Sequence, residues 1–360
     1  MAEKPLLLYI SAHLPSLSFP QAGHKTAYSI LKEYSVNFDI IAVFFLNAGE
    51  NKFYREEDYG FLREIHIFRI NYLTRLAGLV MNPFMPVNGA IRKNRKAARL
   101  ILRLENDNTF SAVHFEFTAA ACYLNYIKPG IWKIYSEHDL TWQALERKLE
   151  KAGGLKRLLL RFEFIRQKKW ELLAIRRMDE VLVHNGKDKG LLLRENISGP
   201  VIKVIKPYIN PAFKEVKRGR EERGAILFWG AMDRAENSDA AGWFIKDIFP
   251  GIISGFPGAR LYIVGANPGE SLKKSACGNI VVTGFVEDPL PYFEKACLAV
   301  APLRLGAGVK VKVLEALSAG LPVVATGIGG EGISDPGLII ADDPEEFIKE
   351  VLGILGSHVG

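Results

Sequence analysis

Residues 301–332 read APLRLGAGVKVKVLEALSAGLPVVATGIGGEG, a pattern that predicts a glycine turn, a short helix and then a buried strand. Gly306 and Gly308 allow the backbone to approach a bound group closely. The helix behind them would direct free N–H groups and the positive end of its dipole at that group. This geometry favours an anion, above all a phosphate.

Charged side chains follow the glycines at helical spacing. Lys310 and Lys312 add positive charge within the first turn. Glu315 follows about one turn later, where its carboxylate can accept hydrogen bonds from hydroxyl groups beside the phosphate. A diphosphate with sugar hydroxyls describes a nucleotide sugar. A GxG turn alone is a weak indication of phosphate binding, because glycine turns open many helices in α/β proteins.

A longer resemblance supports the same reading. The run PLRLGAGVKVKVLEALSAGLPVVAT at 302–326, followed by GGEGI, closely resembles the donor-binding segment of GT-B glycosyltransferases of the family 4 type (glycosyl transferases group 1). Residues 225–250, 259–268 and 279–303 resemble preceding strands and helices of that family's C-terminal domain. The resemblance implies a GT-B fold, in which two Rossmann-like doubly wound parallel-sheet α/β domains face each other across a cleft. It also implies sugar transfer from a nucleotide-diphosphate donor with retention of configuration.

Two features depart from the family pattern. The family has a pair of glutamates here; Glu315 matches the second, and Ala307 occupies the position of the first. The usual arginine and lysine after the first C-terminal strand are not clearly in place, since Arg234 is the only nearby arginine and Asn237 stands near the lysine position. The lysines after the glycine turn are therefore expected to be the main diphosphate contacts.

The resemblance also implies roles for individual residues, with Glu315 on the ribose and Glu331 facing the transferred sugar. The expected donor-binding residues are Gly230, Arg234, Gly306, Gly308, Lys310, Lys312, Glu315, Gly330 and Glu331. The expected catalytic residues are His138, Lys310 and Glu331. The expected acceptor-side residues are Gly23, His24 and Asp139.

Two segments of the N-terminal half carry these last expectations. QAGHK at 21–25 follows the first predicted strand, opens a helix and resembles the family's glycine loop. SEHD at 136–139 ends the predicted strand WKIYS, at the sheet edge where ligands bind in such folds. His138 aligns with a histidine that contacts the donor sugar in related enzymes; the alternative is a structural hydrogen bond at a strand end. His184 and Asn185 end another strand in the same way.

Short β-branched runs alternate with helical patterns throughout the chain, which is typical of parallel sheets built from βαβ units. The predicted strands are 6–11, 38–45, 64–70, 112–115, 133–136 and 181–184, then 225–229, 260–264, 280–283, 298–301, 322–325 and 338–340. A proline-containing charged segment between the two series reads as a surface linker. We expect an acceptor-binding domain at 1–206 and a nucleotide-sugar-binding domain at 207–360.

Composition agrees with two globular domains. The chain has 360 residues, 48% of them hydrophobic, which is enough to fill two cores. No apolar run is long enough for a transmembrane helix, and the N-terminus reads as a strand instead of a secretory signal. The three cysteines, Cys122, Cys277 and Cys297, show neither metal-site nor disulfide spacing. We expect the protein in the cytoplasm.

Positive charge is concentrated in the first 200 residues, which hold 30 Lys and Arg against 21 Asp and Glu. Residues 75–103 and 148–177 combine basic with apolar side chains, which favours contact with an anionic membrane surface at the inner face of the membrane. A solvated helix face is the simpler alternative. No nucleic-acid module accompanies the charge, so no nucleic-acid partner is expected.

The sequence thus predicts a glycosyltransferase that acts on a glycan or lipid-linked saccharide acceptor. No DxD-like pair ends a predicted strand, so neither a metal site nor a cofactor is expected beyond the nucleotide-sugar substrate. Two alternatives stay open. One is a nucleotide-sugar epimerase of the same fold, and the other is a catalytically degenerate GT-B protein retained for binding.

Overall fold

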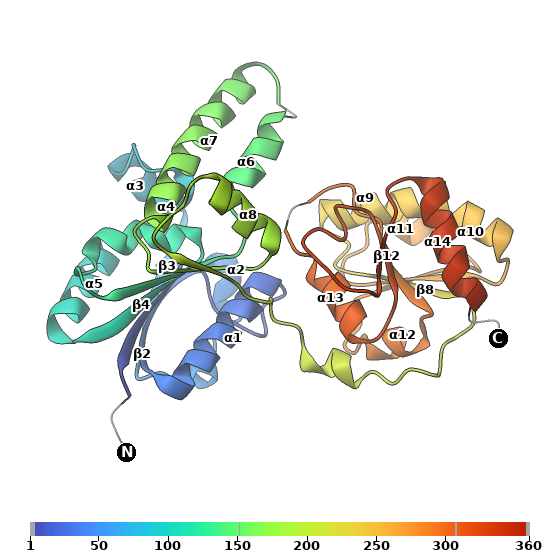
Figure 1. Cartoon of the computed structure of the whole chain (residues 1–360), viewed down its shortest axis with the longest axis horizontal. Coiled ribbons are helices and arrows are strands. Elements are labelled where there is room, and N and C mark those ends of the chain that lie inside the picture. Colours follow the sequence, from blue (N-terminus) through green and yellow to red (C-terminus); the bar gives the residue numbers. More distant parts are fainter. Residues whose placement is uncertain (1–3, 151, 307, 358–360) are drawn as a thin grey trace. The chain divides into compact units, whose positions relative to one another are not determined.

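A computed structural model describes residues 4–150, 152–306 and 308–357. The chain divides into two compact units, Met1–Tyr208 and Ile209–Gly360, each built on a parallel sheet of its own (Figure 1). The division lies slightly beyond the expected limit at residue 206, because the backbone N–H of Tyr208 donates to Thr26 Oγ1 at 2.9 Å and holds this segment on the N-terminal unit.

The N-terminal sheet has the strand order β3-β2-β1-β4-β5-β6-β7, and every neighbouring pair is parallel. Its strands are β1 (Leu6–Ser11), β2 (Asp39–Asn47), β3 (Glu64–Ile70), β4 (Phe110–Glu116), β5 (Trp132–Glu137), β6 (Glu180–Val183) and β7 (Val201–Val204). The winding direction reverses between β1 and β4. The loops that leave these two strands therefore flank the point where open α/β sheets bind their ligands.

Helices cover both faces of this sheet. They are α1 (Ala22–Asn37), α2 (Ala48–Asn51), α3 (Tyr72–Met81), α4 (Val87–Ala90), α5 (Arg95–Asp107), α6 (Thr141–Glu150), α7 (Gly154–Ile175) and α8 (Gly186–Arg194), with 3₁₀ turns at Glu56–Tyr59 and Thr118–Tyr126. Leu7 and Tyr9 of β1 pack into one apolar cluster, and Leu8 and Ile10 pack into the cluster on the other face. Burial on both faces explains why β1 reads as a continuous apolar run.

The C-terminal sheet has the order β10-β9-β8-β11-β12-β13, again parallel throughout. Its strands are β8 (Ala225–Trp229), β9 (Arg260–Val264), β10 (Ile280–Gly284), β11 (Leu298–Ala301), β12 (Val323–Ala325) and β13 (Leu338–Ile340). Its helices are α9 (Ala235–Trp243), α10 (Phe249–Gly255), α11 (Glu270–Lys274), α12 (Leu290–Lys295), α13 (Val311–Ser318) and α14 (Pro344–Ser357), with a 3₁₀ turn at Pro211–Glu215 and a π-helical turn at Phe244–Ile248. Winding reverses between β8 and β11, so the loops after these strands flank the corresponding position.

The predicted fold class of two doubly wound parallel-sheet α/β units is confirmed. One strand was not predicted. β7 is a four-residue edge strand in which only Ile202 is buried, so it lacks the apolar run by which the other strands were recognised. Within the described residues, none of the helices is both long and apolar enough to cross a bilayer.

Candidate functional site

The glycine turn leaves β11 at the reversal point of the C-terminal sheet and leads into α13. Gly306 and Gly308 have φ angles of 113° and 74°, a region that side-chain-bearing residues rarely adopt, so the turn requires glycine. Lys310 is the extended N-cap residue of α13, and the open N–H groups and positive dipole end of the helix face the turn. Ala307, at the position of the family's first glutamate, lies outside the described residues.

Lys312 extends from the first turn of α13 toward the loop after β8. Its Nζ donates to Asn237 Oδ1 at 2.6 Å and lies 5.2 Å from the ring centroid of Phe228. Burial, reinforced by the charge of Lys310, lowers the pKa of Lys312 to about 7. A bound anion would favour the protonated ammonium and raise this pKa again. Lys312 thus brings a cation beside Asn237, close to where the family carries a lysine.

The loop after β8 passes close to the side chain of Lys312 and has a glycine at this position. A Cβ on Gly230 would lie 3.0 Å from Asn237 Nδ2 and 3.6 Å from Lys312 Cδ, and Gly230 has a φ angle of 151°. Arg234 is the N-cap residue of α9, half exposed, with its guanidinium 3.8 Å from Glu236 Oε1. The structure therefore brings Gly230 and Lys312 together, with Arg234 at the start of α9 in the same loop.

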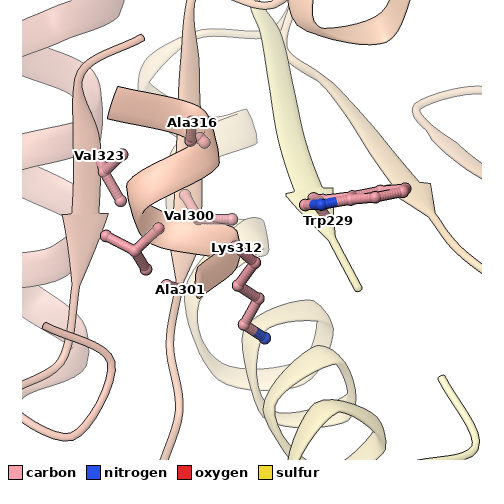
Figure 2. A pocket seen from close by; sticks show the side chains of 8 residues that line it. Trp229, Val300, Ala301, Lys312, Ala316 and Val323 are labelled. Carbon is pink, nitrogen blue, oxygen red and sulfur yellow. The ribbon is translucent and has the colours of Figure 1, made fainter. Parts of the chain in front are cut away.

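Glu315 is held by an aromatic residue from the end of β8. Trp229 donates its indole N–H to Glu315 Oε2 at 2.8 Å, which orients the carboxylate. Trp229 and Lys312 also line a small pocket, with a volume of about 10 Å³, beside the inner strands of the sheet. Figure 2 shows these two side chains extending from β8 and from α13, with the apolar pocket wall formed by neighbours such as Val300 and Val323.

The loop after β12 supplies Gly330 and Glu331. Lys310 donates to the carbonyl of Gly308, and its Nζ lies 3.7 Å from Glu331 Oε2, so this lysine connects the glycine turn with that loop. Gly330 also packs against the end of β13. A Cβ there would lie 2.5 Å from Ile340 Cδ1, so a side chain at this position would displace that of Ile340.

In the N-terminal unit, His138 is the centre of a second group at the carboxyl edge of the sheet. Its Nε2 lies 2.6 Å from Glu116 Oε1, while His114 Nε2 and the hydroxyl of Tyr9 lie 2.9 Å and 2.6 Å from Glu116 Oε2. Burial alone would raise the pKa of Glu116, but the hydrogen bonds and charges of the two histidines outweigh it and hold that pKa well below its usual range. Because the carboxylate only accepts, His138 donates its Nε2–H to Glu116, and Nδ1 is the ring nitrogen left for another partner.

The ring of His138 is fixed by its neighbours. It stacks on Phe117 with centroids 4.2 Å apart, and Phe117 itself has a φ angle of 66°, which is a strained conformation for a bulky residue. Gly23 lies against both rings, since a Cβ there would be 3.2 Å from Phe117 Cε1 and 3.3 Å from His138 Nδ1. The structure therefore brings Gly23 and His138 together. Asp139 is exposed directly after His138.

His24 is tied into the loop that follows β1. It is buried, its Nδ1 lies 2.7 Å from the carbonyl of Leu14, and burial with the nearby charge of His13 lowers its pKa to about 4. His184 packs on His138 at 4.5 Å, and burial followed by the charge of His138 lowers its pKa to about 3. Asn185 caps α8 by accepting from the Asp188 N–H at 2.7 Å, which accounts for it structurally.

One group of described residues has ligand atoms close enough to hold a metal ion: His13, His24 and Glu50, whose donor atoms lie within 4.8 Å of one another. His13 Nδ1 is 2.7 Å from Glu50 Oε1. However, the buried guanidinium of Arg92 lies 3.3 Å from both ring nitrogens of His13. A cation placed here would be repelled by that charge, so the arrangement favours a neutral histidine hydrogen-bonded to a carboxylate.

Sequence reasoning missed three contributors: Trp229, Glu116 and the His13–Glu50 pair. A signal existed for Glu116, because an acidic residue at the carboxyl end of the buried run FSAVHFE requires a partner. Trp229 also ends a buried strand beside the reversal point. The partner of each residue is distant in sequence, so the pairing itself could not be read.

Comparison with known proteins gives one family match and one curated relative. Residues 223–357 match the family model described as glycosyl transferases group 1. An uncharacterized 44.6 kDa protein in the cps region of Klebsiella pneumoniae is 30% identical over 139 residues, which are 35% of this chain and 36% of that protein. The match thus spans about a third of the length of the curated relative.

Solved structures resemble the chain over nearly its whole length. Anabaena HepE in complex with UDP superposes with a TM-score of 0.63 and 11% identity, covering 98% of this chain and 90% of that one. A mutant of S. aureus TarM in complex with Fondaparinux, alpha-GlcNAc-glycerol and UDP gives 0.61 and 9%, covering 97% and 92%. At such identities the likeness establishes the fold. The chain has the GT-B fold, and its residues 223–357 match the model of the glycosyl transferases group 1 family.

Proposed function

We propose that the protein is a metal-independent glycosyltransferase that moves a sugar from a nucleotide-diphosphate donor to an acceptor with retention of configuration. The observation that carries the proposal is the arrangement around the start of α13, where two lysines, a glycine turn and an oriented glutamate converge. The family match over residues 223–357 supports the same activity.

In this proposal the donor's diphosphate lies against the turn of Gly306 and Gly308. Lys310, Lys312 and the α13 dipole offset the negative charge that grows on the leaving diphosphate as the glycosidic bond breaks, which is the task a metal ion performs elsewhere. Glu315, oriented by Trp229, accepts hydrogen bonds from the ribose hydroxyls. Arg234 and Gly230 complete the donor-binding loop.

Glu331 and the backbone at Gly330 are proposed to face the transferred sugar. His138, whose Nε2 is occupied by Glu116, would form a hydrogen bond with a sugar hydroxyl through Nδ1. Gly23, His24 and Asp139 are assigned to the acceptor side. Retention follows from the family resemblance and is proposed on that ground alone.

We propose a glycan or lipid-linked saccharide as the acceptor, and the cytoplasm, at the inner face of the membrane, as the place of reaction. The relative in a cps region and the glycan-type ligand bound to TarM support a saccharide acceptor. The positive charge of the first 200 residues supports the membrane location.

The test is saturable binding of UDP-, GDP- and dTDP-sugars, followed by calorimetry with the best donor. Glu315→Gln removes a charged acceptor and should weaken binding about 10- to 100-fold, because hydrogen bonds to charged groups contribute roughly 1.5–3 kcal/mol. Glu345→Gln, an exposed glutamate of α14, serves as the matched control. Failure of every sugar nucleotide to bind would falsify the proposal.

The same samples separate the alternatives. An epimerase would convert the bound sugar nucleotide into its isomer without any acceptor, whereas a transferase would release nucleoside diphosphate only when an acceptor saccharide is added. A degenerate binding protein would bind the donor but would catalyse neither its isomerisation nor sugar transfer to an acceptor.

A further inference from the structure

Two helices of the N-terminal unit expose large apolar side chains. α3 exposes Tyr72, Leu73, Leu76, Leu79, Val80 and Met81. The first half of α7 exposes a stripe at helical spacing, with exposed fractions from 56% to 72%, formed by Leu155, Leu158, Leu159, Phe162 and Ile165. Single exposed apolar residues are ordinary, but a concentration on neighbouring helices marks an interaction surface.

Contacts join these helices into one surface. α3 rests on α4, since a Cβ on Gly78 would lie 2.2 Å from the carbonyl oxygen of Ala90. The segment 82–87 lies against α7, where Arg166 donates to the Pro83 carbonyl at 2.8 Å. Phe84 is the next residue, and it is 93% exposed. Figure 1 shows the α6–α7 hairpin extending away from the sheet with α3 beside its base. We name α3, residues 82–87 and the first half of α7 the α3–α7 face.

The charge of this face has one sign. Lys156, Arg157 and Arg161 are exposed along the apolar stripe and form no ion pair among the described residues. Neither α3 nor residues 152–162 contain an acidic residue. The next acid along α7, Glu163, is neutralised by Arg166 and accepts the Val87 N–H at 2.7 Å.

The sequence-based expectation of membrane contact also included the basic residues of α5, and the structure gives a reason to leave them out. α5 buries Ala97, Ala98, Ile101 and Leu104 in the core. Its exposed side bears Arg99 and Arg103 beside one exposed leucine, Leu102, and so is an ordinary solvated face.

We propose that the α3–α7 face binds an anionic lipid bilayer. Its apolar side chains would enter the boundary between headgroups and acyl chains, while the lysine and arginines contact anionic headgroups. A second copy of the chain fits less well, because a two-fold contact would bring two faces of the same positive sign together. The inference deepens the proposed function by naming the surface on which a lipid-linked acceptor would be met, but lipid binding requires no turnover.

The experiment is co-sedimentation of the full chain with vesicles of phosphatidylcholine alone or with roughly one quarter phosphatidylglycerol, at low and high salt. We expect binding to the anionic vesicles that weakens with salt. Arg157→Gln combined with Arg161→Gln should reduce the partition coefficient about 25-fold, at about fivefold for each basic residue. Leu158→Ser combined with Phe162→Ser should reduce it as well.

Matched controls make the result specific. Arg99→Gln with Arg103→Gln removes the same charge at the same helical spacing from the same unit, and Val36→Ser with Leu193→Ser removes comparable exposed apolar groups elsewhere. Both controls should bind like the wild type. No binding to anionic vesicles at low salt, or an equal loss in the α5 control, would overturn the proposal. So would a dimer in solution that Leu158→Ser with Phe162→Ser dissociates. Donor binding is measured in a separate experiment. Absence of vesicle binding would therefore leave the proposed function standing, and absence of donor binding would leave the membrane proposal standing.

Discussion

Lys312 is the residue whose protonation should control donor binding. Its pKa of about 7 means that the unbound protein loses this proton at neutral pH, whereas a bound diphosphate restores it. Binding therefore takes up a proton above neutrality, and we expect donor affinity to fall between about pH 7 and about pH 8.5 by up to tenfold per unit. Calorimetry across this range would measure it. Lys312→Met should bind the donor weakly at every pH, and its affinity should not depend on pH in this range. Lys349→Met, at an exposed position of α14, should show the same pH dependence as the wild type. A wild-type affinity that does not change with pH would contradict the assignment.

Glu116 should contribute to stability through its charge. Its pKa in the folded protein lies well below the ordinary value of 4.5, so its contribution is complete above that pH and is lost as the pH falls below it. Glu116→Gln should therefore lower the free energy of unfolding by about 3 kcal/mol at neutral pH and by less near pH 3.5. Urea denaturation at both pH values tests this, with exposed Glu33→Gln as control. Equal stability of Glu116→Gln and wild type at neutral pH would refute the role.

At this scale the sequence could indicate which residues carry chemistry but not what holds them. His138 was singled out at a strand end, and the structure brings it beside Gly23. Its partner Glu116 ends the neighbouring strand, and strand order is not written in local sequence. In the same way Glu315 was placed by helical spacing, while Trp229, its hydrogen-bond donor, is brought in by the β8–β11 pairing.

Two helical glycines should respond in opposite ways to alanine. In α3, a Cβ on Gly78 would meet the backbone of α4 at 2.2 Å, so Gly78→Ala should detach α3 and speed amide exchange over residues 72–81. In α9, Gly242 is exposed with nothing within 4 Å, so Gly242→Ala should stabilise the protein by about 0.5–1 kcal/mol. Hydrogen exchange and thermal denaturation distinguish the two. If Gly78→Ala leaves exchange in α3 unchanged, the close packing of α3 on α4 is not what holds the helix.

Helices and strands could be predicted where burial requires a recognisable pattern of apolar residues. β1 and β8 were predicted to the residue because their apolar runs are unbroken. β7 was not, because an edge strand with one buried residue has no such run.

The whole molecule should unfold in two steps. Each unit has apolar clusters of its own on both faces of its sheet, so neither core requires residues of the other. Calorimetry should resolve two transitions, and a saturating nucleotide sugar should raise most strongly the one that hydrogen exchange assigns to residues 209–360, which carry most of the proposed donor contacts. A single transition that the ligand shifts as a whole would show that the units unfold together.

The contact between Trp229 and Glu315 gives the protein an optical probe of its own donor. A pentose that donates to the Glu315 carboxylate changes the acceptor of the indole N–H, so the emission of Trp229 should change on titration with the correct sugar nucleotide. Trp229→Phe, which leaves the other four tryptophans in place, identifies the part of the signal that comes from this ring. Candidate donors can then be ranked by fluorescence alone, before any acceptor has been identified.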